Sequence, residues 1–247
     1  MTATYAFRDS DTAAARLELV GELFEPTTRA FLSELGRRDV ELALDLGCGP
    51  GHATRLIAEE LAPRRLVGVD TSSRFLEVAG VAFETLAHDV AETPFPLAPA
   101  DLLFCRFLLS HVGEPARALA GWVDALAPGG RILLEEVEWI RTADRAFGLY
   151  LATVRTLLAA RGHRLEIGPL LDRVDPPTGL RRRASRVVTI SPDADRVAWM
   201  FLLNLRAWSD DPLLAPETVA ELEAGLAGGP HGPITWGLRQ IAWEAER

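Results

Sequence analysis

Short apolar segments alternate with amphipathic segments between about residue 40 and residue 139. The apolar segments predict five strands, over Glu41–Leu46, Arg65–Asp70, Ala82–Ala87, Leu102–Cys105 and Arg131–Val137. The segments between them predict helices over Ala53–Leu61, Arg74–Val78 and Pro115–Leu126. Alternation of this kind predicts parallel strands joined by right-handed crossovers. Ligands of such sheets bind at the carboxyl ends of the strands.

The two ends of the chain follow other patterns. Apolar positions at helical spacing between Thr12 and Leu35 are interrupted by Pro26, which predicts two short helices before the first strand. Beyond Trp139 the patterns predict helices over Phe147–Ala160, Asp193–Trp208 and Pro216–Leu226, and strands over Arg183–Ile190 and Ile234–Trp243. We therefore expect a helical cover over residues 1–38, a ligand-binding domain over residues 39–247, and a helical insert at about 191–230.

A glycine-rich turn follows the first strand, in the run Leu44-Asp45-Leu46-Gly47-Cys48-Gly49-Pro50-Gly51. Alternate glycines let the backbone approach a ligand closely, and the amides of the next helix face that ligand with their positive dipole end. A dinucleotide fingerprint requires a third glycine where this chain has His52. The spacing therefore disfavours a pyrophosphate and suits S-adenosylmethionine (SAM), which carries no phosphate.

Two carboxylates follow the next strands. Asp70 ends the second strand, where both of its oxygens can accept hydrogen bonds from ribose hydroxyls, and Asp89 follows the third strand. Each has a plainer interpretation, because aspartate is also common as a helix cap and in turns. A Pro128-Gly129-Gly130 turn precedes the fifth strand.

Together these segments resemble class I SAM-dependent methyltransferases, and within them the actinobacterial small-molecule type, which is distantly similar to quinone-biosynthesis enzymes. The resemblance covers about residues 1 to 140. It implies an α/β fold of the Rossmann-like, doubly wound kind. The expected sheet has seven mostly parallel strands in the order 3-2-1-4-5-7-6, with the last strand antiparallel and a helical cover.

The resemblance also implies roles for single residues. Asp70 is expected to receive the ribose, Asp89 the adenine amine, and Asp45 to hold the glycine turn and the methionine amino group. The residues expected to contact the cofactor are Asp45, Gly47, Cys48, Gly49, Gly51, Asp70, Thr71, Asp89, Val90, Cys105 and Arg106.

Candidate chemistry for the acceptor is concentrated after the fourth and fifth strands. His111 is the first candidate for a general base, because its ordinary pKa lies near the working pH, although it can equally hold its loop. Glu136 is a second candidate, at the end of its strand. The residues expected to contact the acceptor are Tyr5, Phe7, His111, Trp139, Tyr150 and Trp208.

Composition limits the partners. The net charge of −9 argues against nucleic acid, and the histidines and the two cysteines show no metal-ligand spacing. No apolar run is long enough to span a bilayer, so we expect a cytoplasmic monomer or homodimer with no membrane partner and no metal. All basic residues are arginine, which is typical of GC-rich coding, as in actinobacteria.

The expected reaction is therefore SAM-dependent methyl transfer, by in-line displacement, to O, N or C of a small, partly apolar metabolite of specialised (natural-product) metabolism. An alternative is a SAM-fold cyclase or pericyclase that binds SAM without methylating. A nicotinamide-dependent reductase is a third interpretation, disfavoured by His52 and Pro50 in the glycine turn. Product mass separates the first two, since only methylation adds a methylene.

Overall fold

Seven strands form one sheet in the order β3-β2-β1-β4-β5-β7-β6. The computed structural model describes residues 11–36 and 39–246. β7 runs antiparallel to both of its neighbours, and the other pairs are parallel. The expected strand order and the antiparallel last strand are confirmed. The strands are β1 (Leu42–Leu46), β2 (Arg65–Asp70), β3 (Glu84–Ala87), β4 (Ala100–Arg106), β5 (Leu126–Thr142), β6 (Leu180–Ile190) and β7 (Ile234–Ala245).

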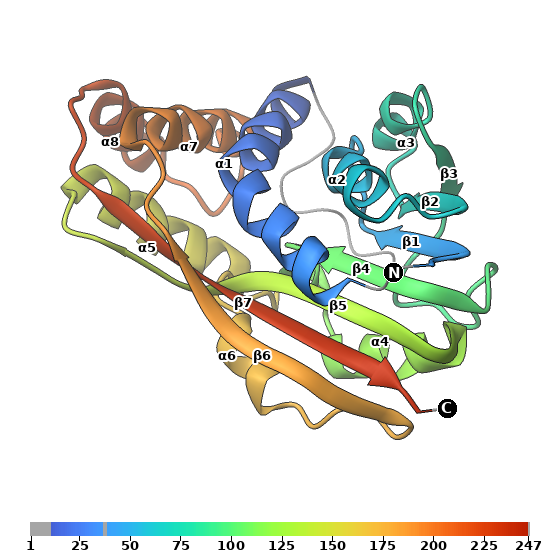
Figure 1. The fold of residues 1–247 in the computed structure, drawn as a ribbon. Coiled ribbons are helices and arrows are strands. Elements are labelled where there is room, and N and C mark those ends of the chain that lie inside the picture. The colour runs from blue at the N-terminus through green and yellow to red at the C-terminus, as the bar shows by residue number, and fades with distance from the viewer. Residues whose placement is uncertain (1–10, 37–38, 247) are drawn as a thin grey trace.

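Helices cover both faces of the sheet, and α5, α7 and α8 gather at one end of the molecule, toward which β4 and β5 run (Figure 1). The helices are α1 (Asp11–Leu35), α2 (His52–Leu61), α3 (Ser73–Ala79), α4 (Pro115–Trp122), α5 (Arg145–Ala159), α6 (Gly168–Arg173), α7 (Ala194–Trp208) and α8 (Pro216–Ala227). α1 packs against both α2 and α7, so it joins the sheet to the helical group at that end.

The strands are buried on both sides because their alternate side chains enter different cores. Leu103 and Leu134 belong to the cluster that contains Trp122 of α4. Their neighbours Phe104 and Leu133 pack instead with Phe31 of α1. A third cluster joins α5, α7 and α8 to the β5 and β7 ends.

Two expectations about the elements are wrong, and one helix is additional to those expected. Residues 11–35 form one helix rather than two, with Pro26 exposed inside it. The helix starting at Pro115 ends at Trp122, because a short 3₁₀ turn follows and β5 begins at Leu126. Helix α6 was not expected, because six residues with a proline at the start carry too little periodic pattern.

A buried polar network fastens α1 to the centre of the sheet. Glu135 of β5 is fully buried, and its carboxylate accepts hydrogen bonds from Thr28 of α1 and, at 2.7 Å, from Gln240 of β7. Arg106 of β4 donates to the Thr28 hydroxyl at 2.9 Å. Burial raises the pKa of Glu135, while the Arg106 charge opposes that shift. The network therefore links the half-buried Arg106 guanidinium, through Thr28, to a buried carboxyl group.

Removing one member of this network is expected to destabilise the protein strongly. Glu135→Ala removes the carboxylate that the buried Thr28 and Gln240 side chains share, and buried donors left without an acceptor cost about 1–3 kcal/mol of the free energy of unfolding. Glu84→Ala breaks the exposed pair with Arg65 and should change stability far less. Urea unfolding of the two variants measures the difference, and equal losses would contradict the assigned role of Glu135.

Candidate functional site

A cavity of about 580 Å³ opens at the carboxyl ends of β1, β2 and β4. The glycine turn and the strand ends form one part of its wall, and residues of α1, α5 and α7 form another. This is the edge where parallel sheets of this order bind ligands. The cavity volume lies within the range of small-molecule sites.

The glycine turn is held open by backbone hydrogen bonds and by left-handed backbone angles. The amides of Gly47 and Cys48 both donate to the Val69 carbonyl, at 2.8 and 3.0 Å. The turn contains Gly47, Gly49 and Gly51, whose φ values are +70°, +52° and +95°. Residues other than glycine rarely adopt such positive φ values. Among the residues that the structure describes, a Cβ on Gly49 would meet only Leu17, at 3.7 Å, so no other described side chain crowds the backbone here.

Asp70 ties the glycine turn to the end of β2. One oxygen accepts from the Gly49 amide at 2.9 Å and the other accepts from the Ser72 amide at 2.9 Å. Each carboxylate oxygen can accept more than one hydrogen bond, so both remain able to receive a ligand hydroxyl. Asp70 lines the cavity, in the place expected for a ribose acceptor.

Asp45 is the buried acid beneath the turn. Its carboxylate accepts from the Thr54 hydroxyl at 2.6 Å. Burial raises the pKa of Asp45 to about 6, although the Thr54 hydrogen bond and the Arg106 charge favour ionisation. A cationic ligand beside it would favour the charged form further.

The end of β3 contributes a second turn to the cavity. Asp89 accepts a hydrogen bond from the Ala91 amide at 2.9 Å. Aspartate commonly makes this bond in turns whether or not a ligand binds nearby. The Val90 carbonyl accepts from the Trp122 indole at 2.8 Å, which fixes the turn to α4. Asp89 and Val90 both line the cavity.

The segment after β4 forms a strained turn at the cavity wall. Phe107 is not glycine but has a φ of +54°, a conformation that costs free energy unless the surroundings impose it. The Glu136 carboxylate accepts from the amides of Leu108 and Leu109 at 2.8 and 2.7 Å. Glu136 therefore holds this turn from below, and it is absent from the cavity lining.

His111 lies at the end of the same turn and lines the cavity. Burial lowers the pKa of His111 to about 3, and the charges of Arg16 and His163 act in the same direction. The imidazole is thus neutral over the physiological range. A neutral imidazole can accept a hydrogen bond or a proton, but at this pKa it is a weak base.

The structure brings most of the expected site residues together around the cavity. Those that line it are Asp45, Gly47, Cys48, Gly49, Asp70, Thr71, Asp89, Val90, Arg106, His111 and Tyr150. Those that do not are Gly51, Cys105, Glu136, Trp139 and Trp208. Tyr5 and Phe7 lie outside the described residues.

The surroundings of three residues outside the lining explain where they lie. Cys105 alternates onto the α4 side of the sheet and is fully buried there. Trp139 packs over Gly237, with the Arg141 guanidinium 4.3 Å from its ring. Trp208 lies behind Tyr150, with the ring centroids 6.3 Å apart.

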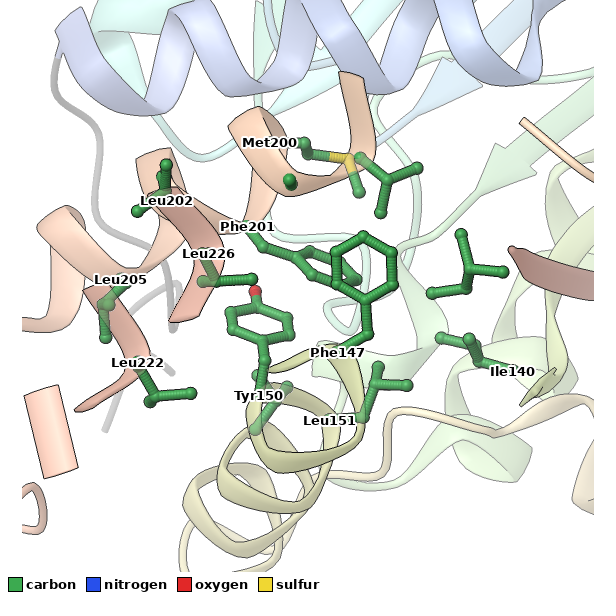
Figure 2. Close-up of a cluster of buried hydrophobic side chains, with 14 of the residues drawn as sticks. Ile140, Phe147, Tyr150, Leu151, Met200, Phe201, Leu202, Leu205, Leu222 and Leu226 are labelled. Carbon is green, nitrogen blue, oxygen red and sulfur yellow. The ribbon is translucent and has the colours of Figure 1, made fainter. Parts of the chain in front are cut away.

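Several wall residues on α7 were not expected as site residues. Met200, Phe201 and Asn204 fall on one face of that helix and line the cavity. The Phe201 ring stacks on Tyr150 of α5 at 3.8 Å between centroids, and the two rings lie among apolar side chains from both helices (Figure 2). Their spacing of one and four residues is equally typical of a helix core, so the sequence could not separate the two roles.

Comparisons with known proteins agree with this geometry. A family described as a methyltransferase domain matches residues 44–134. Over 115 residues the chain is 37% identical to the trans-aconitate 2-methyltransferase of Streptomyces avermitilis, which covers 43% of this chain and 42% of that protein. The chain thus spans less than half the length of this curated relative.

Solved structures share the fold at low sequence identity. A Bacillus halodurans C-125 protein has a TM-score of 0.61 and 16% identity, covering 90% of this chain and 98% of that one. The [4+2]-cyclase SpnF has a TM-score of 0.56 and 18% identity, covering 90% of this chain and 80% of that one.

The sheet order and the glycine turn agree with the family match, which makes residues 44–134 similar to a methyltransferase domain. The similarity to the trans-aconitate 2-methyltransferase of Streptomyces avermitilis likewise extends over only part of the chain.

Two negative findings hold for residues 11–36 and 39–246. No group of three or more His, Cys, Asp or Glu side chains in this part of the chain is arranged to hold a metal ion. No helix in it is long and apolar enough to cross a membrane.

Glu136 gives the stability of the protein a pH dependence that a variant can isolate. Burial raises the pKa of Glu136 to about 8, against the two amide hydrogen bonds, which lower it. Because the folded pKa is raised, the stabilisation is complete below about pH 4.5 and is lost as the pH rises toward 8, by at most about 1.4 kcal/mol per pH unit.

We expect Glu136→Gln to flatten this decline, because the amide cannot ionise and its oxygen still accepts from Leu108 and Leu109. Urea unfolding at pH 5.5 and pH 8 measures the change for each protein. An equal decline in the variant would show that Glu136 does not carry the effect.

Proposed function

We propose that this protein transfers a methyl group from SAM to O, N or C of a small, mainly apolar metabolite. The observation that carries the proposal is the juxtaposition of Asp70 and the open backbone at Gly49 with an apolar wall in one cavity. SAM supplies an activated methyl group on a sulfonium, so the protein has mainly to align the acceptor with it.

The residues around the glycine turn suit SAM in their chemistry. Asp70 has lone pairs for the two ribose hydroxyls, and Asp89 with Val90 borders the space proposed for the adenine. The buried Asp45 carboxyl group suits the positive charges of the amino group and the sulfonium. Arg106, also in the lining, suits the carboxylate of the methionine part.

The rest of the wall supports an apolar acceptor. Most of the side chains that α1, α5, α7 and the end of β5 contribute are aliphatic or aromatic: Val20, Phe24, Val137, Ile140, Leu151, Val154, Met200 and Phe201. The lining also holds three arginines, Arg16, Arg106 and Arg117, so charge alone does not separate an apolar acceptor from a carboxylate. The proposal of an apolar acceptor rests on the aliphatic and aromatic side chains that predominate on this part of the wall.

His111 is proposed as the residue that orients the reacting group of the acceptor. As a neutral imidazole it can accept a hydrogen bond from an acceptor O–H or N–H and so orient the attacking atom. Because the low pKa makes His111 a weak base, the proton that the acceptor loses on methyl transfer passes to solvent. Glu136 is not part of this proposal, because it is occupied by the turn that carries His111. It is a positioning residue for that turn.

Cofactor binding is tested by calorimetric titration with S-adenosylhomocysteine (SAH). We expect micromolar binding to the wild type and a loss of at least tenfold in Asp70→Asn, in which one of the two acceptor oxygens becomes an amide donor. Glu77→Gln removes an exposed carboxylate of α3 and should bind SAH as the wild type does. No binding to the wild type would refute the proposed cofactor.

Methyl transfer is tested by incubating the protein and isotopically labelled SAM with a panel of apolar alcohols, phenols and amines. We expect a product heavier by the labelled methylene, and SAH in equal amount. His111→Ala should form product at least tenfold more slowly while binding SAH unchanged. A product of unchanged mass would replace this proposal with a cyclase, and methylation of trans-aconitate alone would overturn the proposed acceptor class.

A further inference from the structure

A polar pair lies in the part of the cavity wall that α5 and α7 form, among mainly apolar side chains. Asn204 of α7 donates a hydrogen bond from Nδ2 to the Tyr150 hydroxyl of α5 at 2.7 Å. Both residues line the cavity, and both are at least nine-tenths buried. Tyr150 also stacks on Phe201 of α7, and Figure 2 shows these two residues among apolar side chains of α5 and α7.

The Asn204 amide is only half satisfied. Its Oδ1 atom is buried and has no hydrogen-bond partner among the described residues. Buried polar atoms are nearly always paired, and an unpaired one destabilises the fold. A leucine would avoid this loss, as the sequence Val197 to Leu205 is otherwise wholly apolar. The asparagine, the only one in the chain, therefore needs an explanation outside packing.

Tyr150 supplies the complementary half of the pair. Burial raises the pKa of Tyr150, so its hydroxyl stays protonated at physiological pH. A tyrosine hydroxyl that accepts one hydrogen bond still has its own hydrogen to donate. The pair thus offers one acceptor, Oδ1 of Asn204, and one donor, the Tyr150 O–H, at neighbouring positions.

A ligand hydroxyl matches both atoms at once, because it donates one hydrogen bond and accepts another. We propose that Tyr150 and Asn204 recognise a hydroxyl group on an otherwise apolar ligand. The proposal rests on the proposed function only in that this ligand is the methyl acceptor. The pair would then select acceptors by their hydroxyl group. A site built to hydrogen-bond a hydroxyl rejects analogues that lack one.

The test compares two probes of the same shape, 1-naphthol and 1-methylnaphthalene, by calorimetric titration with and without saturating SAH. We expect the wild type to bind 1-naphthol at least tenfold more tightly. In the double variant Tyr150→Phe/Asn204→Leu this ratio should fall to about one. Replacing both partners by apolar groups leaves no orphaned polar atom, so the Tm of the ligand-free double variant should equal or exceed that of the wild type.

Ser209→Ala is the matched control, because Ser209 directly follows α7 and its hydroxyl donates to the Arg206 carbonyl, away from the cavity. It should keep the wild-type ratio. Equal binding of the two probes by the wild type, no binding of either, or an undiminished preference in the double variant would each overturn the inference. A preference for 1-naphthol that persists without any binding of SAH would refute the proposed function and leave this inference standing.

Discussion

Two adjacent glutamates of β5 hold the cavity together from opposite faces of the sheet. Because neighbouring side chains of a strand point to opposite sides, Glu135 reaches α1 and Glu136 reaches the turn after β4. Both are fully enclosed, so their hydrogen bonds are shielded from competing water. The Glu135 carboxyl group holds α1 against the sheet, and the Glu136 carboxyl group holds the strained turn that carries His111.

This arrangement explains why the site combines rigid and adaptable parts. The glycine turn, Asp45 and Asp70 are joined by short hydrogen bonds to the ends of β1 and β2, so their positions follow from the sheet. The opposite wall is made of side chains from α5 and α7, which pack mainly through apolar contacts. Apolar packing tolerates changes of similar volume better than a buried polar network does.

The sequence predicts the first part well and the second part poorly. Gly47, Asp70 and Asp89 lie at or just after strand ends, which the local sequence pattern predicts. Parallel strands bring these ends to one edge of the sheet whatever the conformation of the loops. Strand alternation predicts that Glu136 lies at the carboxyl end of β5, which makes it a candidate base. The sequence does not show that the turn after β4 lies beside it and uses its carboxylate. Asn204 was passed over as a site residue, because only the packing of two helices far apart in sequence shows that its amide is half paired.

Pro26 was expected to end a helix, and tertiary contacts prevailed over that local preference. Phe24 and Phe31, on either side of it, are both buried in different cores, so packing keeps the helix continuous through the proline.

The division of the cavity wall has an evolutionary consequence. The stretch shared with the methyltransferase family ends at residue 134, just before the two glutamates, whereas α5 and α7 lie beyond it. Substitutions on the cavity faces of those helices alter the acceptor side without disturbing the strand ends. Under the proposed function, duplicated copies of such a gene can therefore diverge toward new acceptors while inheriting the same cofactor-binding strand ends.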